Sequence, residues 1–155
     1  MATTAAPQAD VYPSPFPAPS KSASGLIEDT LTEVSSTIFS DKIFITISQA
    51  GKLAHWVHVP LSTASADPMS SGPVSSYDSE NNLLPMSHLT ATTVLGGTKR
   101  DEEVIGQTIA TTIASAILMK RPHEERLLVL GVGLQSGMAG RTQFDEITGL
   151  VLEVL

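Results

Sequence analysis

A glycine-rich stretch raises the first possibility of chemistry in this sequence. Residues 130 to 142 read LGVGLQSGMAGRT and lie between an apolar run and a helical pattern, which is the setting in which backbone N–H groups bind a phosphate. A P-loop requires glycine and lysine where this chain has Gln135 and Arg141. As a dinucleotide fingerprint, its third glycine, Gly137, comes one position late. We therefore expect no nucleotide binding and interpret these glycines as residues of a strand and a turn.

Histidine, serine and carboxylate side chains form no pattern typical of catalysis or metal binding. His55 and His58 are three residues apart in a predicted strand, so they lie on opposite faces and cannot chelate one ion. Ser136 in GLQSG lacks the spacing of a nucleophile elbow. The carboxylates at 101–103 and 145–146 stand where helices are expected to begin. The sequence predicts no enzyme, no cofactor and no metal site.

The composition indicates a small acidic domain. The 155 residues carry a net charge of −7 with only nine Lys and Arg, which argues against nucleic acid as the partner. No cysteine is present, so disulfides are excluded and a reducing compartment is favoured. No apolar run approaches the roughly 18 residues of a membrane span, and no secretory signal is recognisable. We expect no membrane association and a location in the cytoplasm or the nucleus.

Two segments have too few large apolar residues to form a core. Residues 1–25 are rich in proline, alanine and serine, and residues 62–87 are rich in serine and proline. Both compositions are typical of disorder. We therefore predict a disordered arm at 1–25, followed by a single domain at 26–155 that contains a disordered loop at 62–87.

The first half of this domain is predicted to form three strands. Residues 29–39 are rich in β-branched side chains, and residues 43–48 alternate between isoleucine and other residues. Residues 49–52 form a turn signal in which Gly51 can adopt a positive φ. The return strand at 53–59 alternates again, so the sequence predicts a β-hairpin between the second and third strands.

The strand face opposite the isoleucines provides candidate partner-binding residues. Trp56 is the single tryptophan, and we weigh a core position for it before an interface position, where amphipathic aromatic residues are also enriched. The candidates on this face and in the adjoining turn are Phe44, Thr46, Trp56, His58 and Lys52.

The second half is predicted to alternate strands and helices. Residues 102–119 form an amphipathic helix, whose four-residue isoleucine spacing gives one apolar stripe and whose start Thr98 or Asp101 can cap. A strand at 89–96 precedes it. The apolar run at 126–134 indicates an interior strand covered on both faces. Residues 142–155 form a second amphipathic helix with a capping pair, Thr142 and Asp145.

This order of elements defines the expected fold class. It is α+β, a mainly antiparallel sheet of five to six strands flanked by two α-helices on one face. Gly131 and Gly133 share one face of the interior strand, which permits a neighbouring element to approach closely.

Several strings in this order resemble the proteasome assembly chaperone 3 family. They are Ile38-Phe39-Ser40, Ile43 to Ile47, Gln49-x-Gly51-Lys52, Thr93 to Gly96 before a helix and Leu127 to Val132 after it. The resemblance covers about residues 28–152 without the loop at 62–87, and it rests on a pattern of strands and a turn rather than on a catalytic signature.

The resemblance implies a chaperone without enzymatic activity. Members of that family pair with proteasome assembly chaperone 4, and the pair binds α-type subunits while the α-ring of the proteasome core particle forms. We also expect homodimers when the chain is isolated, because its sheet edges carry few charges. The alternative is a small adaptor or scaffold subunit of a trafficking or signalling complex.

Overall fold

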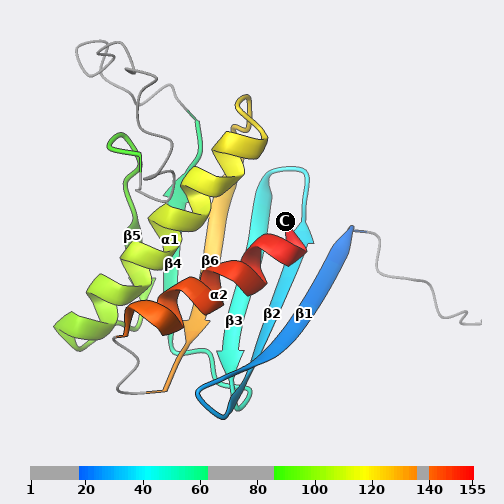
Figure 1. Ribbon diagram of the computed structural model, residues 1–155. Helices are drawn as coiled ribbons and strands as arrows, with labels where there is room; N and C mark the ends of the chain where they lie inside the picture. The colour runs from blue at the N-terminus through cyan, green and yellow to red at the C-terminus, as the bar shows by residue number, and fades with distance from the viewer. Residues whose placement is uncertain (1–17, 63–85, 136–139) are drawn as a thin grey trace, which may run out of the picture.

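The protein forms one six-stranded sheet with two helices on one of its faces (Figure 1). This computed structural model describes residues 18–62, 86–135 and 140–155. The expected α+β fold class is confirmed. The elements in chain order are β1 (Ser20–Ile27), β2 (Thr30–Ile38), β3 (Lys42–Gln49), β4 (His55–Pro60), β5 (Thr92–Leu95), α1 (Arg100–Lys120), β6 (Leu127–Gly133) and α2 (Arg141–Val154).

The strand order is β1-β2-β3-β6-β4-β5, and only the β3–β6 pair is parallel. The predicted hairpin between the second and third strands is therefore wrong, because β6 lies between β3 and β4: Leu130 is paired with Ile45 on one side and Val57 on the other. The turn itself forms, with Gly51 at a φ of +68°. The connection then passes around the end of β6, where the N–H of Ala54 donates to the carbonyl of Val132 at 3.0 Å.

The domain begins earlier than expected, because residues 20–25 belong to strand β1 rather than to the arm. The sequence of this strand has no clear apolar pattern, because its side chains on the face away from the helices are mainly serines. Its other side contributes Gly25, which lies against Leu150 of α2, and the buried Ile27. Residues 1–17 and 63–85 of the predicted arm and loop are outside the described part of the chain. Met86 lies inside the predicted loop, yet its N–H donates to Ser115 Oγ of α1 at 2.9 Å, so this end of the segment is attached to the domain.

The core lies between the helices and one face of the sheet. α1 packs on β4 and α2 packs on β1 and β2, and burial of the apolar stripes drives this packing. The isoleucine stripe of α1 is confirmed at 109, 113 and 117, which are all buried. The buried side chains from the sheet and from α2 include Val34, Ile43, Ile45, Ile47, Val57, Val59, Leu128, Leu130, Ile147, Val151 and Val154.

The predicted helix caps are wrong in both helices. The N-cap of α1 is Lys99 rather than Thr98 or Asp101, and no side chain caps it. The N-cap of α2 is Gly140, whose N–H donates to Gln143 Oε1 at 3.4 Å. The N-cap of α2 is therefore two residues earlier than the predicted cap, Thr142.

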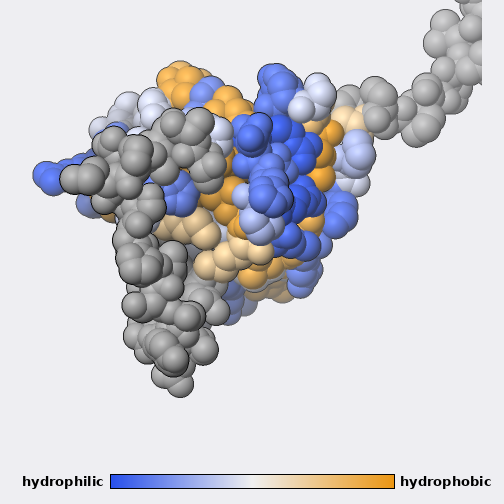
Figure 2. Space-filling view, turned by 90° about the horizontal axis from the view of Figure 1, so that it is seen from above, coloured by the Kyte–Doolittle hydropathy of each residue, from blue (hydrophilic) through white to orange (hydrophobic). Residues whose placement is uncertain are grey.

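Polar and apolar residues share the surface at the end of the domain where β2 turns into β3. Figure 2 shows this end from above, with hydrophobic residues (orange) on both sides of a hydrophilic band (blue). Within the described residues, neither helix combines the length and hydropathy needed to cross a membrane.

Candidate protein–protein interface

One face of the sheet has no helix over it in the described part of the chain. Both helices lie on the opposite face (Figure 1). We call the surface that points away from the helices the open face. The strand register assigns to it Ser22, Ser24, Leu26, Leu31, Glu33, Ser35, Thr37, Lys42, Phe44, Thr46, Ser48, Leu127, Val129, Gly131, Trp56, His58 and Leu95.

An aromatic pair lies at the centre of the open face. Trp56 of β4 is paired with Gly131 of β6, and Gly131 has no side chain, so the indole extends across β6. A Cβ added at Gly131 would lie 2.9 Å from the indole ring. The ring reaches Phe44 of β3, with ring centroids 5.6 Å apart and planes inclined by 34°. A glycine in the middle strand thus lets aromatic residues of the two neighbouring strands meet.

Apolar residues continue from the aromatic pair toward β5. Leu127 and Val129 of β6 are half-buried, and Leu95, the partner of Trp56 in β5, is 65% exposed. Monomeric proteins rarely leave a contiguous apolar surface on a sheet face unless it is a contact site. The β3-β6-β4-β5 side of the open face therefore has the properties of a protein-binding surface.

The β1–β2 side of the same face is mostly polar, apart from the exposed Leu26 and Leu31, which are paired with each other near the turn between these strands. Its side chains are mainly serines and threonines, and the hydroxyls of Ser35 and Thr46 are hydrogen-bonded at 2.6 Å. Apart from the Leu26–Leu31 pair, the open face thus consists of an apolar half and a hydroxyl-rich half.

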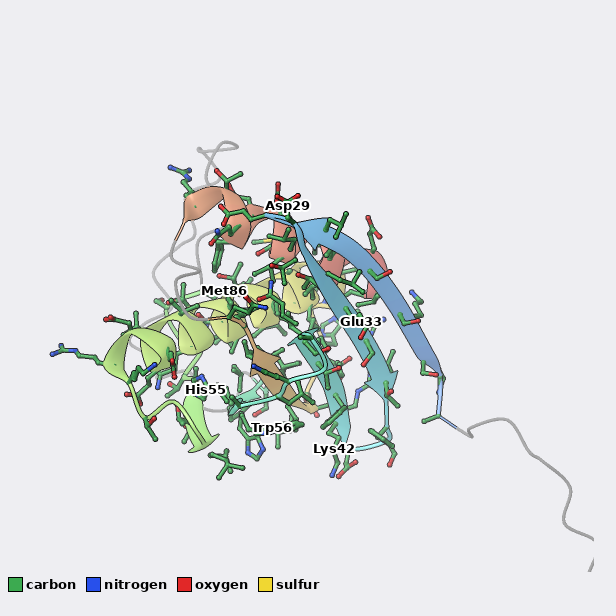
Figure 3. All side chains as sticks on the ribbon, turned by 90° about the horizontal axis from the view of Figure 1, so that it is seen from below. Asp29, Glu33, Lys42, His55, Trp56 and Met86 are labelled. Atoms are coloured by element: carbon green, nitrogen blue, oxygen red, sulfur yellow. The ribbon has the colours of Figure 1, made fainter. Side chains whose placement is uncertain are left out.

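The structure brings four of the five predicted interface residues together on the open face. Phe44, Thr46, Trp56 and His58 are all half-buried there, and in Figure 3 Trp56 lies on the side of the sheet away from the helices. Lys52 does not join them, because it is exposed in the turn before β4. The core position weighed for Trp56 is wrong, since the helices cover the other face.

Three apolar residues of this surface, Leu127, Val129 and Leu95, were not predicted from the sequence. The run containing Val129 was interpreted as covered on both faces, whereas the helices cover only one. The signal that could have identified this surface is a glycine among large apolar residues in β6, because it leaves room for a large side chain from a neighbouring strand.

The two histidines of β4 lie on opposite faces, as predicted. His55 is only 5% exposed, and its Nε2 lies 3.0 Å from Thr93 Oγ1 of β5. Gln107 Nε2 of α1 donates to the same hydroxyl and to Glu103 Oε1, both at 3.3 Å. Burial lowers the pKa of His55, and the charge of Glu103 partly offsets this effect.

The His55 network can be compared with the arrangement of a catalytic nucleophile and base. A hydroxyl beside an imidazole can act as a nucleophile when a third group orients the base. Nδ1 of His55 has no hydrogen-bond partner among the described residues, and α1 encloses the ring. The network connects β4, β5 and α1 through the buried His55 and the half-buried side chains of Thr93 and Gln107.

The other possibilities raised by the sequence are a metal site and the glycine-rich loop. No group of three His, Asp or Glu residues could hold a metal ion within the described ranges. Of the glycine-rich loop, residues 136–139 are outside the described part, and the N–H of Gln135 donates to the buried Gln49 Oε1 at 2.8 Å. The start of this loop is therefore fixed to the end of β3.

Comparison with known proteins gives a likeness in fold. No protein-family model and no curated protein matches the sequence. Among solved structures, the chain is similar to a chain in the crystal structure of a novel chaperone complex for yeast 20S proteasome assembly. The TM-score is 0.51 and the identity 17%, and the likeness covers 86% of this chain and 96% of that chain. At this identity the likeness shows a shared fold.

Proposed function

We propose that this protein is a non-enzymatic chaperone of proteasome assembly that acts as one subunit of a heterodimer. Its partner is proteasome assembly chaperone 4, and the pair binds α-type subunits and promotes formation of the α-ring of the core particle. The protein works in the cytoplasm or the nucleus. The shared fold with a chain of a yeast proteasome assembly chaperone complex supports this function.

The open face is the surface that we assign to the partner chaperone. The observation that carries this proposal is the aromatic pair of Phe44 and Trp56, which occupies a sheet face without a covering helix in the described chain. Aromatic residues at the centre of a contact surface contribute much of the binding energy when a partner removes them from water. Sheet faces also pack well on each other, as in two-layer sandwiches.

The α-type subunits must then use surfaces that the partner leaves free. The outward sides of α1 and α2 remain accessible when the open face is covered, and they carry exposed apolar residues such as Val104 and Leu152. We assign the partner chaperone to the open face and leave these outer surfaces for the subunits.

Sedimentation equilibrium tests this function. The isolated chain, its equimolar mixture with proteasome assembly chaperone 4, and the mixture after addition of α-type subunits are compared. We expect a 1:1 complex that forms in preference to homodimers and then binds α-type subunits. Two monomeric species that never associate would contradict the proposal.

Substitutions on the open face test whether this surface binds the partner chaperone. Phe44→Glu and Trp56→Glu place a charge on the open face, so we expect folded chains that no longer bind proteasome assembly chaperone 4. Leu152→Glu is the matched control, because Leu152 is 44% exposed on α2. Affinity purification from cells distinguishes the alternative: recovery of trafficking or signalling proteins instead of proteasome subunits would favour an adaptor.

A further inference from the structure

A hollow of about 480 Å³ lies on the open face beside the aromatic pair, over β1, β2 and β3. Ser22 and Ser24 of β1, Glu33 and Ser35 of β2, and Thr46 and Ser48 of β3 line it. The register places Glu33 between Ser24 and Ser48 in one row across the three strands. Hydroxyl groups and a single carboxylate therefore form the walls of this hollow.

The carboxylate of Glu33 has no partner in the described chain. It is exposed, and neither a hydrogen bond nor an ion pair joins it to another described residue. Lys42 is the basic residue of the open face, and its Nζ lies 3.0 Å from Asp41 Oδ2. Lys21 is paired with the buried Ser36, so it points to the helix side of the sheet.

A partner that covers the open face would take Glu33 out of water. Burying an unpaired carboxylate is costly, and a buried charge is tolerated when an opposite charge and hydrogen bonds compensate for it. The side chains that line the hollow around Glu33 include hydroxyls but no lysine or arginine. The compensating charge must therefore come from the partner.

We propose that this hollow receives a lysine or arginine side chain of the partner chaperone. The basic group forms an ion pair with Glu33 and donates hydrogen bonds to the surrounding hydroxyl oxygens. The inference rests on the proposed function, because it requires a partner on the open face. It goes further by naming the chemistry that the partner presents: an apolar surface against Trp56 and Phe44, with one basic residue beside it.

This arrangement also gives the interface a preferred register. The apolar contact is non-directional, whereas a charge pair at one end of it fixes the orientation of the two sheets and disfavours partners without the base. The net charge of −7 adds a general attraction for a partner with a basic surface.

Calorimetric titration of proteasome assembly chaperone 4 into the full chain tests the inference. Glu33→Gln removes the charge and keeps the shape, so we expect binding to weaken about tenfold or more. The affinity of the variant should also depend less on salt between about 0.05 and 0.5 M NaCl, because salt screens an ion pair that the variant lacks. Glu153→Gln is the control, because it makes the same charge change at an exposed position of α2.

The outcomes separate the two proposals. If the wild-type chain binds and Glu33→Gln binds equally well with the same salt dependence, the basic-residue inference is wrong and the proposed function stands. If the wild-type chain does not bind this partner at all, both are wrong. If Glu33→Gln abolishes only self-association, the hollow binds a second copy of this chain. The inference that it receives a lysine or arginine of the partner chaperone is then wrong.

Discussion

The imidazole of His55 fills the space that a side chain at Gly106 would need. A Cβ added at Gly106 would collide with Nδ1 of the ring, so α1 can approach β4 because this helical position is glycine. A glycine inside a helix costs about 1 kcal/mol relative to alanine. Here that cost is offset by the close packing of helix and sheet.

We therefore expect Gly106→Ala to destabilise the protein. Overpacking typically costs about 1–3 kcal/mol, and the enclosed ring of His55 has little room to move. Gly149→Ala is the matched control, because no atom lies within 4 Å of its added Cβ in α2, and it should be stabilising by up to about 1 kcal/mol. Urea unfolding measures both, and a more stable Gly106→Ala variant would contradict the close contact.

His55 should titrate below the usual range of histidine. Burial lowers its pKa, so between the folded-state pKa and about 6.5 the unfolded chain binds more protons than the folded one. Stability is therefore lost as the pH falls from about 6.5 toward the folded-state pKa. Proton NMR of the His55 ring C2–H signal measures the titration. A His55 signal that titrates above pH 6.5 would refute the effect of burial.

Glu124 should contribute to stability at neutral pH and lose that contribution in acid. The guanidinium of Arg126 donates to Oε1 and Oε2 of Glu124 at 2.7 and 2.6 Å, which holds the pKa of this carboxyl below its usual value near 4.5. A depressed carboxyl pKa adds stability above the unfolded-state pKa, and this stability is lost as the pH falls through the folded-state pKa.

The variant Glu124→Gln tests this pair. We expect it to be less stable than the wild type at pH 7, and the difference should shrink as the pH falls below about 4.5. Glu125→Gln is the control, since the neighbouring carboxyl is exposed. Urea unfolding at several pH values gives both curves, and a difference that does not depend on pH would show that packing rather than charge is lost.

Two glycines of β6 should differ in their tolerance of alanine. A Cβ at Gly133 would collide with the backbone carbonyl of Lys52, whereas a Cβ at Gly131 would meet the outer end of the Trp56 ring. A side chain can rotate away more easily than a backbone can shift. We expect Gly133→Ala to lower the midpoint of thermal unfolding much more than Gly131→Ala. Only Gly131→Ala should change the tryptophan fluorescence while the fold persists, and equal losses in both variants would contradict this prediction.

Alternation along a strand predicted the two faces of β3 and β4 correctly. Ile43 and Val57 are buried under the helices, and Phe44 and Trp56 lie on the open face, because burial on one side imposes a period of two. Alternation shows which side chains share a face of a strand, but it does not show which strand is its neighbour in the sheet. Alternation therefore predicted four residues of the candidate interface, but not that Trp56 would reach Phe44 across Gly131.

The missed elements have a common physical origin. Strand β1 has serines on its solvent side and Ala23 and Gly25 facing α2, so its sequence carries little hydrophobic signal although its backbone is fully paired with β2. The hairpin was predicted because a short turn usually joins paired strands. The insertion of β6 depends on contacts far apart in the sequence, and local patterns do not encode them.

The position of β6 also constrains the time course of folding. Ile45 cannot pair with Leu130 until β6 has been synthesised. Before that point, β1, β2 and β3 can pair as one unit and β4 and β5 as another, and the strand that joins the two units is missing. Joining the units requires closure of a long loop, and such non-local contacts slow folding. Until β6 has left the ribosome, the apolar strand edges of β3 and β4 lack their native partner. The nascent chain is therefore itself exposed to aggregation through these edges before it can act on other proteins.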